Sequence, residues 1–187
     1  MLGFPLGILS AAGAGGVAAS DYELIETNIL GSNQASITFS NLGDYSSTYK
    51  HLQIRYAARS ARAAADDQLT IRLNADSTGN YAWHRVLGNG SGVSSTGATS
   101  TSTPQISAIP AASATANIFN GAVIDILDPY STSKNKTIRS LNGFTSSWIA
   151  LHSTLWMSTA SLTSVELIGQ NGNLAANSRF SIYGIKG

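Results

Sequence analysis

Polar and apolar residues alternate along most of the chain after residue 20. In the segment 49–60, Leu52, Ile54 and Tyr56 fall on one face, and the residues between them are polar or charged. The segment 68–74 repeats the pattern. A period of two is typical of a β-strand with one buried and one exposed face. We therefore predict that both segments are strands of a sheet that covers a core.

Further segments have strand character and are separated by turn residues such as Asn171-Gly172. They are 22–30, 34–40, 81–88, 105–110, 119–129, 135–144, 147–158, 162–169 and 178–187. The first two predict a hairpin or two neighbouring strands. The segment 105–110 predicts a short edge strand, and 119–129, which is the most apolar, predicts a central strand.

Two stretches depart from the alternation. Residues 91–103 are all Ser, Thr, Gly or Ala except Val93, which predicts a long surface loop. No segment after residue 20 predicts a helix, although residues 57–67 contain good helix formers and leave a short helical turn open as an alternative. About ten short strands with turns between them predict an all-β fold over residues 21–187. The expected architecture is an antiparallel β-sandwich of the jelly-roll type.

The opening segment, residues 1–20, is apolar, rich in Gly and Ala, and free of charge. A secretion signal has a basic region before its apolar stretch, whereas the first basic residue here is Lys50. A membrane helix needs about 20 continuous apolar residues, and Pro5 and several glycines interrupt this stretch. We predict an extended docking arm. Its side chains that would be buried in a partner or at a trimer axis are Leu2, Phe4, Leu6, Ile8 and Leu9.

The composition narrows the choice of partners and of chemistry. Hydrophobic residues make up 43% of the chain and charged residues only 11%, against roughly 25% charged in ordinary soluble domains. The net charge is +1, which gives no electrostatic reason to expect nucleic acid or a membrane as partner. The absence of cysteine excludes disulfides and zinc–thiolate sites. A neutral, hydroxyl-rich surface is typical of a protein packed against neighbours.

The motifs that carry chemistry are incomplete. The three histidines, His51, His84 and His152, lie in strand patterns and no pair has a short metal-ligand spacing. Residues 74–80, NADSTGN, match the start of a calcium loop, but the position of its bidentate glutamate is Arg85. This stretch is therefore predicted to be a turn, and no cofactor or metal is expected.

Two carbohydrate-directed alternatives remain open. Tyr81 and Trp83 lie close to the 91–103 segment, and exposed aromatic rings in such a place would suit a carbohydrate-binding module. A glycan-cleaving enzyme would need a pair of carboxylates, and the sequence does not show which acids face each other. The available acids are Asp66, Asp67 and Asp125.

The stretches STYKHLQIR (47–55), NKTIRSL (135–141) and RFSIYGIKG (179–187) are the most specific part of a resemblance that covers nearly the whole chain. They resemble a family of small virion proteins of tailed bacteriophages, common among marine and cyanobacterial phages. The resemblance implies a non-enzymatic structural role on the particle, and it transfers no catalytic residue.

The expected protein is therefore made in the bacterial cytoplasm and placed on the exterior of the virion as a homotrimer, attached by residues 1–20 to capsid, neck or tail proteins. A short fibre or spike and a capsid decoration protein are both compatible with the sequence. In a fibre, the 91–103 segment would face the host. The candidate residues for recognising a host surface glycan are Tyr81, Trp83, Ser95 and Thr96.

Overall fold

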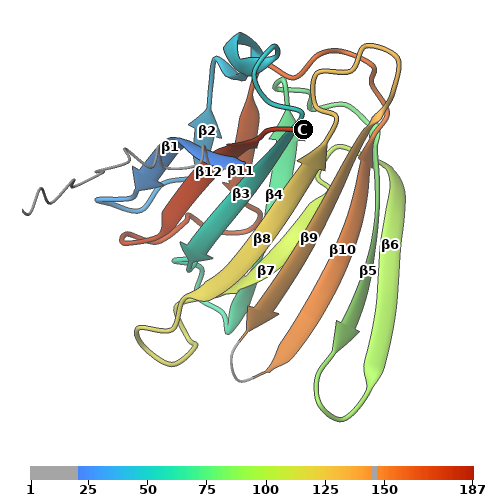
Figure 1. The fold of residues 1–187 in the computed structure, drawn as a ribbon. Coiled ribbons are helices and arrows are strands. Elements are labelled where there is room, and N and C mark those ends of the chain that lie inside the picture. Colours follow the sequence, from blue (N-terminus) through green and yellow to red (C-terminus); the bar gives the residue numbers. More distant parts are fainter. Residues whose placement is uncertain (1–20, 145–146) are drawn as a thin grey trace, which may run out of the picture.

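The computed structural model describes residues 21–144 and 147–187, which form two antiparallel sheets packed against each other (Figure 1). The larger sheet has eight strands in the order β1-β12-β3-β8-β9-β10-β5-β6, and the smaller has four in the order β2-β11-β4-β7. The predicted all-β sandwich is confirmed. The strands are β1 (Tyr22–Ile29), β2 (Ser36–Phe39), β3 (His51–Ala58), β4 (Asp66–Leu73), β5 (Tyr81–Gly88), β6 (Val93–Thr101), β7 (Gln105–Pro110), β8 (Asn120–Leu127), β9 (Lys136–Phe144), β10 (Trp148–Trp156), β11 (Val165–Gly169) and β12 (Arg179–Ile185).

The core lies between the two sheets and follows the alternation predicted from the sequence. Leu52 and Ile54 of β3 face Leu69, Ile71 and other apolar residues of the smaller sheet, and all four are almost completely buried. The predicted central strand is β8, in the middle of the larger sheet, and the predicted edge strand is β7. One 3₁₀ helix, Leu42–Tyr45, connects β2 to β3.

Eight strands pair in a nested order: β1 with β12, β2 with β11, β3 with β8, and β4 with β7. Successive pairs of this set lie in alternate sheets, with β1–β12 and β3–β8 in the larger sheet and β2–β11 and β4–β7 in the smaller one. The other four strands form two hairpins, β5–β6 and β9–β10. Both hairpins continue the larger sheet beyond β8, and Figure 1 shows them reaching past the smaller sheet.

The predicted hairpin or neighbouring pair at 22–30 and 34–40 is wrong. The strand β1 pairs with β12 in the larger sheet, whereas β2 pairs with β11 in the smaller one. Leu30 is buried, and its backbone N–H donates to the carbonyl oxygen of Ser178 at 2.9 Å. The chain is therefore held against the C-terminal part as it crosses between sheets, and it does not fold back on β1.

The predicted surface loop at 91–103 is also wrong, because Val93–Thr101 is the edge strand β6. It pairs with β5 through backbone groups, and nearly all its side chains are exposed. A strand that buries no side chain needs no apolar alternation, which explains why the hydrophobic pattern gave no sign of it.

The helical turn considered for 57–67 does not form. The backbone N–H groups of Ser60 and Ala61 donate to the carbonyl oxygens of Pro110 (2.8 Å) and Asn173 (2.7 Å), so distant segments take the place of helical acceptors. The described residues include no helix long and apolar enough to cross a membrane.

Candidate interaction surface

The outer face of the larger sheet carries a band of exposed apolar side chains. Val123 of β8, Leu141 of β9, Leu151 of β10 and Val86 of β5 lie directly opposite one another on successive strands. Each is between 38% and 54% exposed. Because residues opposite each other on adjacent strands are about 5 Å apart, the four side chains form one continuous row.

A second row lies on the same face, two residues along each strand from the first, and makes the surface of this band uneven. Ile149 of β10 lies opposite Gly143 on one side and Gly88 on the other, and Gly88 lies opposite Val93. Ile149 is 57% exposed and Val93 is 77% exposed. The glycines have no side chains to cover their neighbours, so hollows of about 240 and 460 Å³ lie beside Ile149.

We define the apolar stripe as the exposed apolar side chains of these two rows: Val86, Val93, Val123, Leu141, Ile149 and Leu151. Exposed apolar patches of this kind mark surfaces that bind protein or ligand. Completing the burial of one half-exposed Leu or Ile would contribute about 1 kcal/mol. The stripe is thus suited to association with another protein surface.

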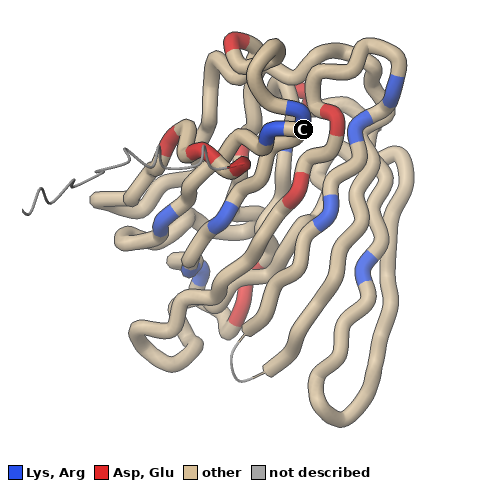
Figure 2. The backbone as a smooth tube through the Cα atoms, viewed as in Figure 1, with Lys and Arg blue, Asp and Glu red and all other residues tan. Residues whose placement is uncertain are grey.

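Charged residues are rare at the end of the larger sheet formed by β10, β5 and β6. The strands β10, β5 and β6 contain one residue that is Lys, Arg, Asp or Glu, namely Arg85, and Figure 2 shows these strands almost without colour. The next row along the outer face is polar and includes Asp125 and Arg139, which lie opposite each other. Gln53 donates to the Asp125 carboxylate at 2.8 Å. The stripe therefore has a polar border on one side.

The two predicted aromatic recognition residues do not offer a surface to a sugar. Tyr81 is completely buried and Trp83 is 7% exposed. The Tyr81 ring packs on Trp156, with centroids 6.4 Å apart, and its hydroxyl accepts a 2.9 Å bond from the backbone N–H of Leu73. The prediction of Tyr81 and Trp83 as contact residues is corrected, because both rings lie on the inner face of β5 and pack into the interior.

The other predicted recognition residues are accessible. Ser95 and Thr96 are both exposed on β6, on opposite faces of this edge strand. The five predicted docking residues of the arm, Leu2, Phe4, Leu6, Ile8 and Leu9, lie outside the described residues.

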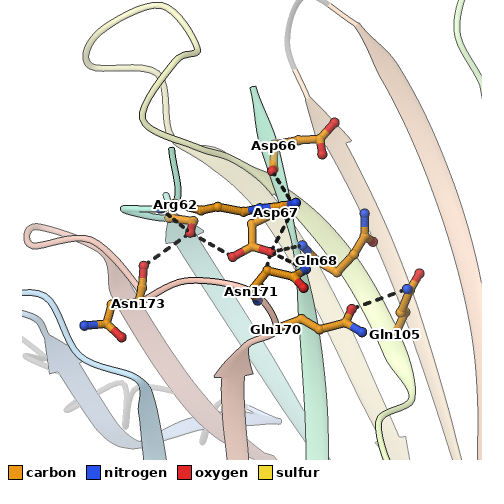
Figure 3. A network of polar contacts seen from close by, with 9 residues as sticks. Arg62, Asp66, Asp67, Gln68, Gln105, Gln170, Asn171 and Asn173 are labelled. Carbon is orange, nitrogen blue, oxygen red and sulfur yellow. Dashed lines mark hydrogen bonds and ion pairs between the residues drawn. The ribbon is translucent and has the colours of Figure 1, made fainter. Parts of the chain in front are cut away.

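The acids considered for glycan cleavage are not brought together. Asp67 is fully buried at the start of β4, where it accepts bonds from the Ser60 hydroxyl (2.9 Å) and the Asn171 side-chain amide (3.0 Å) (Figure 3). Asp66 follows the alternation to the other side of β4, and Asp125 belongs to β8 in the other sheet. The Asp67 network joins β4 to the segment between β11 and β12, so its role is structural.

Residues 74–80, which match the start of a calcium loop in sequence, form a turn. Its carboxylate, Asp76, accepts bonds from the Thr78 backbone N–H (2.9 Å), the Asn80 amide (2.9 Å) and the Trp156 indole (2.7 Å). Burial acts to raise the pKa of Asp76, but these bonds outweigh it and hold the pKa well below its ordinary value. Among the described residues, no three His, Asp or Glu side chains are grouped to hold a metal.

The stripe is the feature that the sequence reasoning missed, although a signal was present. In β8 the outward Val123 stands next to the inward Ile124, so apolar residues occupy both alternating sets. Strands of this kind are typical of sheets covered on both faces.

A scan of the chain against protein-family models and a search of curated proteins both find no match.

Proposed function

We propose that the protein is a non-enzymatic structural component on the exterior of a tailed-phage virion, held there as a homotrimer by contacts with other virion proteins. The apolar stripe is the observation that carries this proposal, because an uncharged face of exposed Leu, Ile and Val suits packing against protein. The phage setting comes from the sequence resemblance. A short fibre or spike and a capsid decoration protein both fit.

The nested strand order supports a jelly roll extended by two hairpins. A jelly roll has eight strands in two sheets, and the nested set gives two groups of four, β1-β12-β3-β8 and β2-β11-β4-β7. The β9–β10 and β5–β6 hairpins then enlarge one sheet and supply most of the apolar stripe.

The test places a charge within the stripe. We expect Leu151→Asp to reduce the number of copies per particle at least tenfold, measured by quantitative mass spectrometry of purified virions. The matched control is Ser153→Asp, which adds the same charge to the same face of β10 outside the stripe. Normal incorporation of a folded Leu151→Asp protein would show that the stripe is not the docking face.

A second test concerns the N-terminal arm, residues 1–20. We expect that deleting residues 2–12 leaves a folded domain that no longer joins particles, as measured by thermal unfolding and by electron microscopy of the virions. Normal assembly of the truncated protein would remove the arm from the proposal and leave the stripe.

Carbohydrate recognition is a second candidate function, favoured by a cleft of about 510 Å³ at the tip of the larger sheet. Asn89, Phe144 and Trp148 are among the residues that line it. The rings of Phe144 and Trp148 lie 5.9 Å apart at 59°, and Trp148 is partly exposed. An aromatic side chain with an apolar face and a polar N–H at the mouth of a cleft can stack on a sugar.

A glycan array with the wild-type protein and Trp148→Ala tests this second function. We expect signals on particular glycans that the substitution removes. Binding that is absent, or that is unchanged by the substitution, would leave the structural role as the function of the protein.

A further inference from the structure

Arg85 occupies an unusual position for a charged residue. It lies on the inner face of β5, between the buried Trp83 and the half-buried Leu87, and its side chain is only partly exposed. Its Nε atom is buried and has no hydrogen-bond partner. No carboxylate of the described residues forms an ion pair with it. A buried guanidinium N–H without an acceptor costs free energy, so a ligand that brings an acceptor atom to this group would be bound favourably.

Two buried side chains of β10 share this condition. His152 lies directly opposite Arg85, and Thr154 is the next residue on the same face. They are 1% and 2% exposed, and neither the His152 Nε2 atom nor the Thr154 hydroxyl has a partner. Cross-strand neighbours lie about 5 Å apart and diagonal ones about 7 Å apart, so the three unpartnered groups are close to one another.

The surroundings of His152 show that Nε2 is a donor. The Asn142 side-chain nitrogen lies 3.1 Å from His152 Nδ1 and 3.4 Å from the carbonyl oxygen of Ile106. A carbonyl oxygen only accepts, which identifies the Asn142 atom as nitrogen, and the bond to His152 then requires an unprotonated Nδ1. The ring proton is therefore on Nε2. Burial, and next the charge of Arg85, lower the pKa of His152 to about 4, so the ring is neutral at neutral pH.

Arg85, His152 and Thr154 together present three N–H or O–H groups and one positive charge. A ligand that satisfies them must carry several acceptor atoms and about one negative charge. A carboxylate meets both conditions, and a guanidinium binds it in a two-pronged arrangement. A phosphate dianion would bring a second negative charge that no cation of β5, β6 or β10 balances.

The edge strand β6 lies beside Arg85. Thr96 pairs with Arg85, Ser94 pairs with Leu87, and both hydroxyl-bearing residues are exposed. Below the larger sheet, β7 packs against β8, β9 and β10. The hydroxyl groups along β6 would suit the hydroxyls of a sugar attached to the carboxylate.

We propose that Arg85, His152 and Thr154 form a binding site for the carboxylate of an acidic saccharide, with Thr96 at its entrance. The site is on the opposite face of the sheet from the apolar stripe, so it is independent of the proposed structural function. It also gives Thr96 of the exposed edge strand a role in binding a saccharide, whereas Tyr81 and Trp83 are buried.

The experiment is a titration of the full-length protein with glucuronate, glucose and inorganic phosphate, followed by NMR of the histidine side chains and by calorimetry. We expect glucuronate to bind and to shift the His152 Nε2 resonance, with glucose much weaker. Phosphate that binds as tightly as glucuronate would overturn the choice of a carboxylate, and binding of neither anion would overturn the site.

Two variants locate the binding. Arg85→Gln should weaken glucuronate binding at least tenfold, whereas Arg139→Gln, which removes an exposed arginine from the other face of the sheet, should not. Thr154→Val keeps the shape of the side chain and should weaken binding several-fold even if Arg85→Gln fails to fold. Unchanged binding in folded Arg85→Gln, or in Thr154→Val, would contradict the assignment.

Discussion

The two halves of the larger sheet differ in the character of their inner faces. In the core half, made of β1, β12, β3 and β8, the inner face is mainly apolar and includes Ile54, Ile124 and Phe180. In the hairpin half, made of β9, β10, β5 and β6, the inner face carries Asn142 and His152 among other polar side chains. Both halves show the same period of two, and Tyr81, Ile138 and Trp156 of the hairpin half join the same apolar core, but polar side chains share the rest of that inner face.

The comparison shows that a continuous ladder of strands can serve two purposes. The core half is held by side-chain burial, which dominates folding stability. The hairpin half buries fewer apolar side chains, and it is also held by its backbone ladder and by bonds to β7, where Ser140 donates to the carbonyl oxygen of Ile106. The hairpin half therefore combines a few core residues and polar groups on its inner face with an apolar stripe on its outer face and an uncharged edge strand.

The largest expected effect is the loss of a core side chain. Phe180→Ala should lower the free energy of unfolding by about 3–5 kcal/mol, because the fully buried ring leaves a cavity next to Tyr56. Leu87→Ala in the hairpin half should cost less than about 1.5 kcal/mol, because Leu87 is only half-buried. Urea denaturation measures both. Equal losses would remove the distinction between the two halves.

The Asp67 network in the smaller sheet comes next. Asp67→Ala should cost about 3–4 kcal/mol, since it leaves the partners of a fully buried carboxylate without their acceptor. Asp66→Ala is the neighbouring control, because Arg62 donates to the backbone carbonyl of Asp66, which the substitution retains. Thermal unfolding should separate the variants, and a mild effect of Asp67→Ala would mean that water replaces the carboxylate.

The buried histidine of the hairpin half predicts a pH dependence. The pKa of His152 is lowered from 6.5 to about 4, so between these values the unfolded chain binds a proton that the folded protein does not. Stability should therefore fall as the pH drops from 7 to 4, by about 3 kcal/mol from this residue.

Urea denaturation at several pH values checks this expectation. The slope should decrease in His152→Gln and remain in His84→Gln, because His84 is exposed on the same sheet. A wild-type slope in His152→Gln would assign the effect to other groups.

The smallest effect is expected on the apolar stripe. Leu141→Ser should change the free energy of unfolding by less than about 0.5 kcal/mol in the isolated chain, because the side chain is 54% exposed and lies outside the core. Its effect should appear instead in the number of copies per particle, measured by quantitative mass spectrometry of purified virions. A large loss of stability in a monomer would mean that the stripe contributes to folding.

The sequence predicts which residues are buried better than it predicts which strands are neighbours. Alternation identified the inner faces of β3 and β4 correctly, because a period of two is a local property. The partners of β1 and β2 could not be read from it, since Tyr22 pairs with Ile185 at the far end of the chain. The strand β6 was not predicted for a related reason: it is held by backbone pairing, which leaves no pattern of hydrophobic residues in the sequence.

The candidate site was harder to predict than the fold. Trp83 was expected near a surface loop, but the alternation within β5 turns it inward together with Tyr81. The cross-strand neighbours Arg85 and His152 are far apart in sequence, so only the register of β5 and β10 brings them together. The apolar residues of the stripe were visible, yet their outward direction became clear only with the second sheet in place.

The nested strand order has a consequence for synthesis of the chain. Among the described strands, β1 pairs only with β12 and β2 only with β11. Neither can find its partner until the last part of the chain has left the ribosome, whereas the β5–β6 and β9–β10 hairpins can close as soon as they emerge. Folding dominated by such distant pairings is slow. During that interval the stripe and the unpaired strand edges are exposed together. Newly made copies of the protein are therefore most prone to aggregate before the last strands have paired.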